Sequence, residues 1–168
     1  MTIRRAAAAD LDALERMLER CSVRTRTLRF SIPVRSLPRA YAAGIARPAR
    51  GEAHWVAENG GEIAALASVT GAEAAVLVED AWQRQGLGMR VLERAVDDAA
   101  RHGVTELAAD VAFDSPHALR MLSRLGAATV SVTPEGYRLV MKLATRAEPC
   151  STARTTRRTA RSRARSRS

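Results

Sequence analysis

Cysteine, histidine, lysine and aromatic residues are all scarce in this chain of 168 residues, which has only 2 cysteines, 3 histidines and 4% aromatic residues. Cys21 and Cys150 lie too far apart in the sequence to form a disulfide framework. The histidines and cysteines show no metal-ligand spacing, so we expect no metal site. Lys142 is the only lysine, which excludes the Gly-Lys-Ser/Thr end of a phosphate-binding P-loop.

Long apolar runs are also missing, since no segment approaches the ~20 residues that a membrane span needs. Residues 1–5 lead straight into a helical pattern without the apolar core of a signal peptide. Hydrophobic residues make up 46% and charged residues 27% of the chain, which is typical of one globular domain. We therefore expect a cytoplasmic protein that has no membrane contact.

The net charge of +9 is concentrated at one end of the chain. Residues 151–168 contain seven arginines and no acid, so the rest of the chain is close to neutral. We predict a folded domain over residues 1–145 and a disordered Arg/Ser-rich tail over 146–168, because the tail has no apolar periodicity. Such a tail binds nucleic acid only non-specifically, through counterion release, or is an inert extension.

Hydrophobic periodicity predicts an α/β fold. A strand over residues 2–5 is followed by a helix that Asp10 caps and that ends near Cys21. Residues 22–50 are less regular and contain one or two helical turns within 37–45. The remaining predicted elements are strands at 54–58, 62–70 and 73–80, a helix from 87 to about 102, a strand at 105–113, a helix after Ser115, and two closing strands around 130–132 and 137–143.

The most informative segment joins the strand that ends near residue 80 to the helix that begins near 87. Gly86 and Gly88 open this helix. Backbone N–H groups and the helix dipole make a helix N-terminus suited to phosphate, and glycines let a ligand approach the backbone closely. Arg84 and Arg90 add positive charge. Val91 stands where a Rossmann fingerprint needs its third glycine.

The string Gln83-x-x-Gly86-x-Gly88 resembles the signature of the GNAT superfamily of N-acetyltransferases, and the order of elements over residues 2–144 is similar. The resemblance implies the acyl-CoA N-acyltransferase fold, a mixed and mostly antiparallel sheet that splays between strands four and five, with helices on both faces. It implies acetyl-CoA as cosubstrate and no metal. The backbone of Val76, Leu77 and Val78 would pair with pantetheine. The pyrophosphate would lie on the amides of Gln83, Arg84, Gln85, Gly86, Leu87, Gly88 and Met89.

Two further patterns resemble bacterial protein lysine acetyltransferase domains: Ser22 followed by Leu28-Arg29-Phe30, and Ala72-Glu73 thirteen positions before Gly86. In that subgroup the glutamate is the general base, which implies this role for Glu73. Strand alternation places Glu73 and Glu79 on one face among apolar neighbours, so Glu79 is the second candidate. The alternatives are a solvated strand-start residue for Glu73 and a turn carboxylate for Glu79.

The chain departs from the family pattern at two positions. Ser115 stands where many members have an asparagine, and we expect it to cap the following helix and bond the pantetheine arm. Leu122 stands where many members have the tyrosine that protonates the departing thiolate. Either Ser123 or water then supplies that proton, or no general acid is needed.

The resulting prediction is an N-acetyltransferase that moves an acetyl group from acetyl-CoA to a primary amine by direct attack, with a carboxylate as general base. The acceptor is a small-molecule amine or a protein lysine. One alternative is a catalytically weak acyl-CoA-binding regulatory module on the same fold, and another is a nucleic-acid-binding protein that acts through its tail. The sequence also allows a homodimer.

Overall fold

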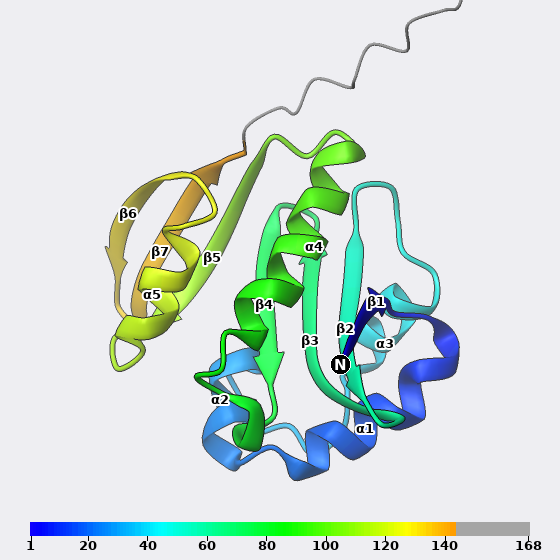
Figure 1. Ribbon diagram of the computed structural model, residues 1–168. Helices are drawn as coiled ribbons and strands as arrows, with labels where there is room; N and C mark the ends of the chain where they lie inside the picture. Colours follow the sequence, from blue (N-terminus) through cyan, green and yellow to red (C-terminus); the bar gives the residue numbers. More distant parts are fainter. Residues whose placement is uncertain (144–168) are drawn as a thin grey trace, which may run out of the picture.

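The computed structural model describes residues 1–143, and these residues form a seven-stranded mixed sheet with helices on both faces (Figure 1). The predicted tail and the domain boundary at residue 145 lie outside the described residues. The strand order is β1-β2-β3-β4-β5-β7-β6. The strands are β1 (Thr2–Arg5), β2 (Ala53–Asn59), β3 (Glu62–Thr70), β4 (Glu73–Val78), β5 (Glu106–Ala112), β6 (Ala127–Thr133) and β7 (Gly136–Lys142).

The helices divide between the two faces of the sheet. They are α1 (Leu11–Arg20), α2 (Val23–Phe30), α3 (Arg39–Ala46), α4 (Leu87–Arg101) and α5 (Pro116–Leu122), with short 3-10 turns at η1 (Ala8–Asp10) and η2 (Asp80–Trp82). Helix α4 packs on the face that carries Ala65 and Ala67 of β3. Helices α1 and α3 pack on the opposite face, against Leu66 and Leu77. The predicted α/β architecture is confirmed.

Helix α4 is held by a continuous apolar stripe. Its buried side chains recur at helical spacing and include Leu87, Val91, Leu92, Ala95, Val96 and Ala99. Burying a Leu or Val side chain stabilises the fold by about 1.5–3 kcal/mol. Alanines on the facing strand let the helix lie close to the sheet. This packing fixes the start of α4 beside the end of β4.

Strands β4 and β5 are parallel and touch at one end only. Their register contains the single pair Glu73↔Ala108, and the Ala108 N–H donates to the Ala72 carbonyl at 2.6 Å. Beyond this contact β4 pairs with β3 alone. In Figure 1 the wing formed by β5, β7, β6 and α5 diverges from β4 toward the start of α4. The predicted splay between strands four and five is therefore confirmed.

Two local predictions differ from the structure. Residues 23–30 form helix α2, whose N-terminus is capped by the Ser22 hydroxyl accepting from the Thr25 N–H at 3.2 Å. Asp10 does not cap α1 with its side chain. Its carboxylate accepts two hydrogen bonds of 2.7 Å from the Arg4 guanidinium and one from the Ala7 N–H, because an arginine fork offers a carboxylate two charged donors at once. No helix among residues 1–143 is long and apolar enough to cross a membrane.

Candidate active site

The open end of the gap between β4 and β5 meets the N-terminus of α4. After β4 ends at Val78, the turn η2 leads to Gly86, which precedes α4 with φ 75°. This left-handed conformation suits glycine, because it has no Cβ to clash with its own backbone. Arg84 in the same loop also has positive φ, at 60°. Arg84, Gln85 and Gly86 are exposed, so the loop presents its backbone to solvent.

The backbone N–H groups of this loop are available to a ligand. Apart from hydrogen bonds within α4, only two backbone groups of residues 83–89 bond to another described backbone group. The Gln83 N–H donates to the Asp80 carbonyl, and the Gly86 carbonyl accepts from the Arg90 N–H. The first N–H groups of a helix have no carbonyl partner within the helix. Leu87, Gly88 and Met89 occupy these positions, so their N–H groups and the helix dipole can receive an anion.

The structure gives the two glycines of the motif different roles. A Cβ on Gly86 would meet no atom within 4 Å, so this glycine faces open space. A Cβ on Gly88 would lie 3.2 Å from Val78 Cγ2 and 3.7 Å from both Val76 Cγ2 and Met121 Sδ. Gly88 therefore lets α4 approach β4 and α5 closely at the open end of the gap.

Side chains on the loop tie it to α2. Gln83 Nε2 donates to the Val78 carbonyl at 3.0 Å and to Thr25 Oγ1 at 3.1 Å. Asp80 accepts from the Ser22 N–H and hydroxyl, both at 2.8 Å, and from the Thr25 hydroxyl. Burial would raise the pKa of Asp80, but the hydrogen bonds from Ser22 and Thr25 lower it overall. The polar side chains here position the loop, and its backbone faces outward.

The free edge of β4 lines the gap. The Glu79 N–H donates to Ala64 on β3, whereas the Ala72 carbonyl accepts from β5. Because backbone groups alternate between the two edges of a strand, the even-numbered residues Val76 and Val78 direct theirs toward the gap. The Val78 carbonyl already accepts from Gln83. An extended ligand arm could therefore pair with the backbone of Val76. The backbone of Leu77 instead faces β3, and its side chain lies in the core.

Glu73 lies at the closed end of the gap, where β4 pairs with β5. Its side chain is 51% exposed and forms an ion pair with Arg138 of β7. Arg138 also donates to both carboxylate oxygens of Asp110, at 3.0 and 2.8 Å. The hydrogen bonds to Glu73 and then Asp110 raise the pKa of Arg138. Arg138 thus orients the Glu73 carboxylate of β4 and the Asp110 carboxylate of β5.

Glu79 lies at the other end of β4, and its side chain is only 12% exposed. Its carboxylate accepts from Arg20 Nε at 3.0 Å, and Arg20 also donates to the Ile63 carbonyl at 2.8 Å. The hydrogen bond to Glu79 raises the pKa of Arg20. The two predicted carboxylates therefore occupy opposite ends of one strand, and each has its own arginine partner.

Ser115 and Leu122 lie on the wing side of the gap. Ser115 is buried, but its side chain does not cap α5 as predicted. Among the described residues, its hydroxyl donates a hydrogen bond only to the Asp114 carboxylate, at 3.4 Å. Its carbonyl accepts from the Ala118 and Leu119 N–H groups instead. Leu122 is a core residue, and the neighbouring Ser123 hydroxyl donates to the Leu119 carbonyl at 2.9 Å.

The sequence did not predict a buried polar cluster on the α1–α3 face of the sheet. His54 is buried and its Nδ1 lies 3.0 Å from Ser68 Oγ, which also forms a hydrogen bond with the Tyr41 hydroxyl. Burial lowers the pKa of His54; Glu52 opposes this shift and Arg29 adds to it. Ser68 pairs with Ala75 of β4, so the cluster lies one strand from the gap.

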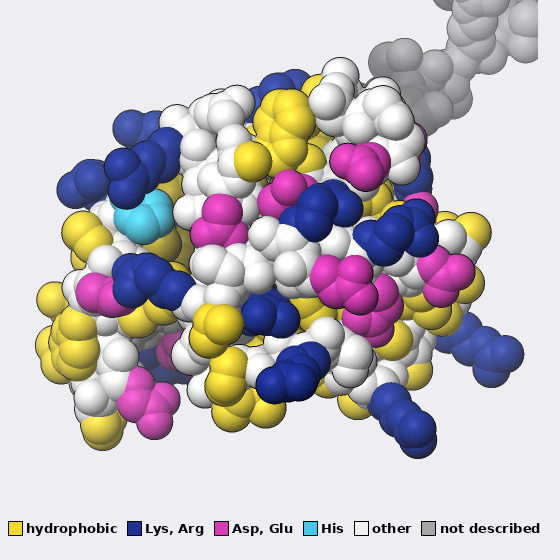
Figure 2. All heavy atoms as spheres, turned by 90° about the horizontal axis from the view of Figure 1, so that it is seen from below, with side chains coloured by type: hydrophobic (Ala, Val, Ile, Leu, Met, Phe, Trp, Pro, Cys, Tyr) yellow, Lys and Arg dark blue, Asp and Glu magenta, His cyan; other side chains and the backbone are white. Residues whose placement is uncertain are grey.

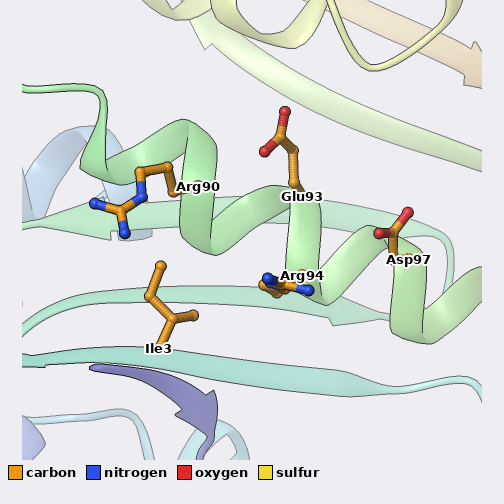
Figure 3. Close-up of a pocket in the computed structure, with 5 residues that line it drawn as sticks. All are labelled: Ile3, Arg90, Glu93, Arg94 and Asp97. Carbon is orange, nitrogen blue, oxygen red and sulfur yellow. The ribbon is translucent and has the colours of Figure 1, made fainter. Parts of the chain in front are cut away.

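Surface features elsewhere do not compete with this site. Figure 2 views the open end from below, where arginines and acids are interspersed and no broad area carries one sign. A hollow beside α4 is lined by Ile3 and by four side chains of that helix: Arg90, Glu93, Arg94 and Asp97 (Figure 3). This hollow adjoins β1, at the far edge of the sheet from β5. Among residues 1–143 no group of His, Cys, Asp and Glu could hold a metal ion.

The comparisons with known proteins agree with this geometry. The profile described as the acetyltransferase (GNAT) family matches residues 13–127. No curated protein sequence matches the chain significantly. The GNAT domain of Streptomyces lividans PAT superposes with TM-score 0.72 and 23% identity, covering 84% of this chain and 89% of that one.

Two further solved structures share the fold. The Salmonella typhimurium acetyltransferase yncA, solved with its cofactor acetyl-CoA, has TM-score 0.68 and 23% identity, covering 90% of this chain and 98% of that one. The Vibrio cholerae spermidine N-acetyltransferase SpeG variant has TM-score 0.60 and 16% identity, with coverages of 84% and 95%. The chain belongs to the acetyltransferase (GNAT) family, and it is an acyltransferase enzyme.

Proposed function

We propose that this enzyme transfers an acetyl group from acetyl-CoA to the primary amine of a small molecule or a protein lysine. The observation that carries this proposal is the array of backbone N–H groups without helical partners at the start of α4, placed beside the free edge of β4. An anion suits the first feature and an extended amide-containing arm suits the second. Acetyl-CoA has both parts, and it is the cofactor in the yncA structure.

The residues present fit acetyl-CoA. The N–H groups of residues 83–89 would hold the pyrophosphate, with the exposed Arg84 adding charge. The gap-facing backbone of Val76 and Val78 would align the pantetheine arm along β4, and Ser115 lies on the opposite side of the gap. No acidic side chain occurs within residues 83–89 to repel the phosphates. When bound, acetyl-CoA would supply the thioester that the amine attacks.

We further propose Glu73 as the general base and Glu79 as the second candidate. The acceptor amine must lose a proton when it bonds to the acetyl carbon, and a carboxylate can accept that proton directly or through one water. Arg138 fixes the orientation of Glu73 at the β4–β5 contact. Leu122 supplies no acidic hydrogen, so the coenzyme leaves as a thiolate that takes its proton from water.

The test is release of free coenzyme A across a panel of amines, measured for the parent and for Glu73→Gln and Glu79→Gln. We expect Glu73→Gln to retain coenzyme binding but to lose roughly 10²–10⁴-fold in turnover near pH 7, with partial recovery at high pH, where the amine is already neutral. Glu79→Gln should lose much less. Parental rates in Glu73→Gln on a verified acceptor would move the role to Glu79.

A regulatory module that binds acyl-CoA without efficient turnover is the second candidate, and Leu122 favours it because its side chain has no acidic hydrogen for the departing thiolate. Tight coenzyme A binding with no release above the rate of spontaneous hydrolysis, for every amine in the panel, would support the module over the enzyme.

A further inference from the structure

Strand β6 is the outer strand of the wing, and its free edge is long and uncharged. Its 7 residues, Ala127–Thr133, include only alanine, threonine, serine and valine. Among the described strands β6 has one neighbour, β7, and its other edge is uncovered (Figure 1). Such an edge is a template for another strand, and proteins ordinarily protect it with charge, proline or a short strand length. None of these protections is present within β6.

The opposite edge of the sheet, formed by β1, has the protection that β6 lacks. Strand β1 has only 4 residues, and Arg4 and Arg5 are two of them. Arg4 forms ion pairs with Asp10 and Glu58, so charged side chains line this strand. A short, charged edge disfavours pairing with another chain. Of the two edges of the described sheet, β6 is therefore the one suited to such pairing.

The strand register shows which backbone groups of β6 point outward. The Ala108 N–H donates to Ala72 before β4, so the odd-numbered residues of β5 face β7. Their partners on β7 are also odd-numbered, which leaves the even-numbered residues of β7 to bond with odd-numbered residues of β6. The N–H and carbonyl groups of Ala128, Val130 and Val132 therefore point away from the sheet. No described backbone group outside the sheet bonds to them.

The valine side chains at these outward-facing positions are exposed. Val132 is 74% exposed, which is the largest fraction among the exposed large hydrophobic side chains of residues 1–143, and Val130 is 48% exposed. Their direct partners on β7 are Tyr137 and Leu139, which pack with the core on the α4 face. A strand placed beside β6 would therefore cover these valines and satisfy the outward backbone groups together.

The two ends of β6 carry opposite charges that match a second copy of the same strand. Arg124 lies shortly before β6 and Glu135 directly after its last residue but one, and both side chains are exposed. In an antiparallel pair of β6 strands, the Arg124 end of each copy lies beside the Glu135 end of the other. A two-fold axis through Val130 repeats this contact at both ends, so the edge is complementary to itself.

We propose that two copies of this chain form a homodimer by antiparallel pairing of their β6 strands, centred on Val130. Ala128 of each copy then lies opposite Val132 of the other, and about six backbone hydrogen bonds join the two edges. One strand edge is a small interface, so the dimer is weak, with a dissociation constant of about 1–100 µM. Strands β5 and β7 separate β6 from the β4–β5 gap, so the dimer leaves both gaps open and does not depend on the proposed activity.

Sedimentation equilibrium of the full chain, over a concentration range of about 1–300 µM that brackets this constant, measures the dimer. Val130→Pro removes one outward N–H and spares the bonds between β6 and β7, because proline is tolerated on the free side of an edge strand. Val132→Lys places a charge on the edge. Val23→Lys is the matched control, since Val23 on α2 is also an exposed valine. Thermal unfolding of each variant reports whether the fold is retained.

We expect the parent to pass from monomer to dimer within this range. Val130→Pro and Val132→Lys should each raise the dissociation constant at least about 10-fold, because the edge loses hydrogen bonds or gains a charge. Val23→Lys should match the parent. A parent that stays monomeric at every concentration would overturn the proposal, and so would a dimer that folded Val130→Pro leaves intact.

Charge reversal tests the antiparallel register. Arg124→Glu and Glu135→Arg should each raise the dissociation constant roughly 3–30-fold, because like charges then meet at both ends of the paired strands. The double variant restores opposite charges at both ends and should return to the parental constant. A double variant that dimerises no better than either single variant would overturn the antiparallel pairing. An extended segment of another protein on this edge, in place of a second copy, would leave the isolated parent monomeric.

Discussion

Arginine organises most of the charge in the described part of this molecule. Arg4 joins Asp10 to Glu58, Arg138 joins Glu73 to Asp110, and Arg24 of α2 reaches Asp114 at 2.6 Å across to the wing. The exposed pairs among these, from Arg138 and Arg24, contribute only about 0–1 kcal/mol each. Their main effect is on orientation, because they hold α2 and the wing in place on either side of the gap.

Asp98 is the exception, because its carboxylate is almost fully buried at the centre of a hydrogen-bond network. It accepts from Trp55 Nε1 at 2.9 Å, from Arg5 and from Arg101. We expect Asp98→Ala to lower the free energy of unfolding by about 2–3 kcal/mol, since the Trp55 indole and two arginines lose a buried, charged acceptor. Asp97→Ala, at the adjacent exposed position, should change it by less than about 0.5 kcal/mol. Denaturant unfolding of both variants tests this, and equal losses would contradict it.

The buried His54 predicts how stability changes with pH. Burial lowers its pKa below the ordinary value of about 6.5. The unfolded chain therefore takes up a proton at a pH where the folded chain does not. Stability is complete above about pH 6.5 and is lost as pH falls from there toward the lowered pKa of the folded state. The lowered pKa values of Asp10 and Asp98 matter only below about pH 4.

We expect the melting temperature to fall between pH 7 and pH 5 in the parent and to change less in His54→Asn. His117→Asn is the control and should retain the parental pH dependence. Calorimetric scans at several pH values measure the difference. Parallel curves for the parent and His54→Asn would show that His54 is not the titrating group.

At the scale of elements, the start of α4 carries the cofactor proposal. Gly88→Ala adds only a methyl group that would lie 3.2 Å from Val78, so we expect a modest loss of coenzyme A affinity. Gly88→Glu adds bulk and a negative charge beside the proposed pyrophosphate site, and we expect the dissociation constant to rise more than 10-fold beyond that of Gly88→Ala. Calorimetry with coenzyme A measures both. Affinity in Gly88→Glu equal to that of the parent would place the pyrophosphate elsewhere.

Most helices and strands could be predicted because each has a clear hydrophobic periodicity and ends at a recognisable turn or cap. The strand predicted at 62–70 coincides with β3 at both ends. The Asn59-Gly60-Gly61 turn connects it to β2 as a hairpin. Helix α2 escaped prediction, since none of its residues is buried. It is held by contacts of Ser22 and Thr25 with Asp80 and Gln83, which are far from the helix in sequence.

The polar cluster escaped prediction for a different reason. Counting outward from the hairpin turn pairs His54 with Ala67. A bulge between Ala57 and Glu58 shifts the register by one residue, so that His54 pairs with Ser68. A single inserted residue changes every partner beyond it, and no local sequence signal marks this bulge. Loop motifs can thus be recognised from sequence, whereas contacts between strands depend on exact register.

At the scale of the whole molecule, residues 1–143 contain a seven-stranded sheet and a buried core on each of its faces. We therefore expect removal of residues 151–168 to leave the melting temperature and coenzyme A release unchanged. It should abolish binding to heparin or nucleic acid that weakens with salt, because those residues carry seven arginines and no acid. A truncated chain that melts earlier would assign a structural role to this segment.

The one-ended contact between β4 and β5 has a consequence for isotope exchange. The amides of Leu77 and Glu79 point toward β3, whereas those of Val76 and Val78 point into the gap. In deuterated water the amides along β4 should therefore exchange alternately slowly and rapidly. A coenzyme arm lying along this edge would slow the fast set and leave the slow set unchanged, so the change in exchange would map, residue by residue, how far into the gap the arm extends.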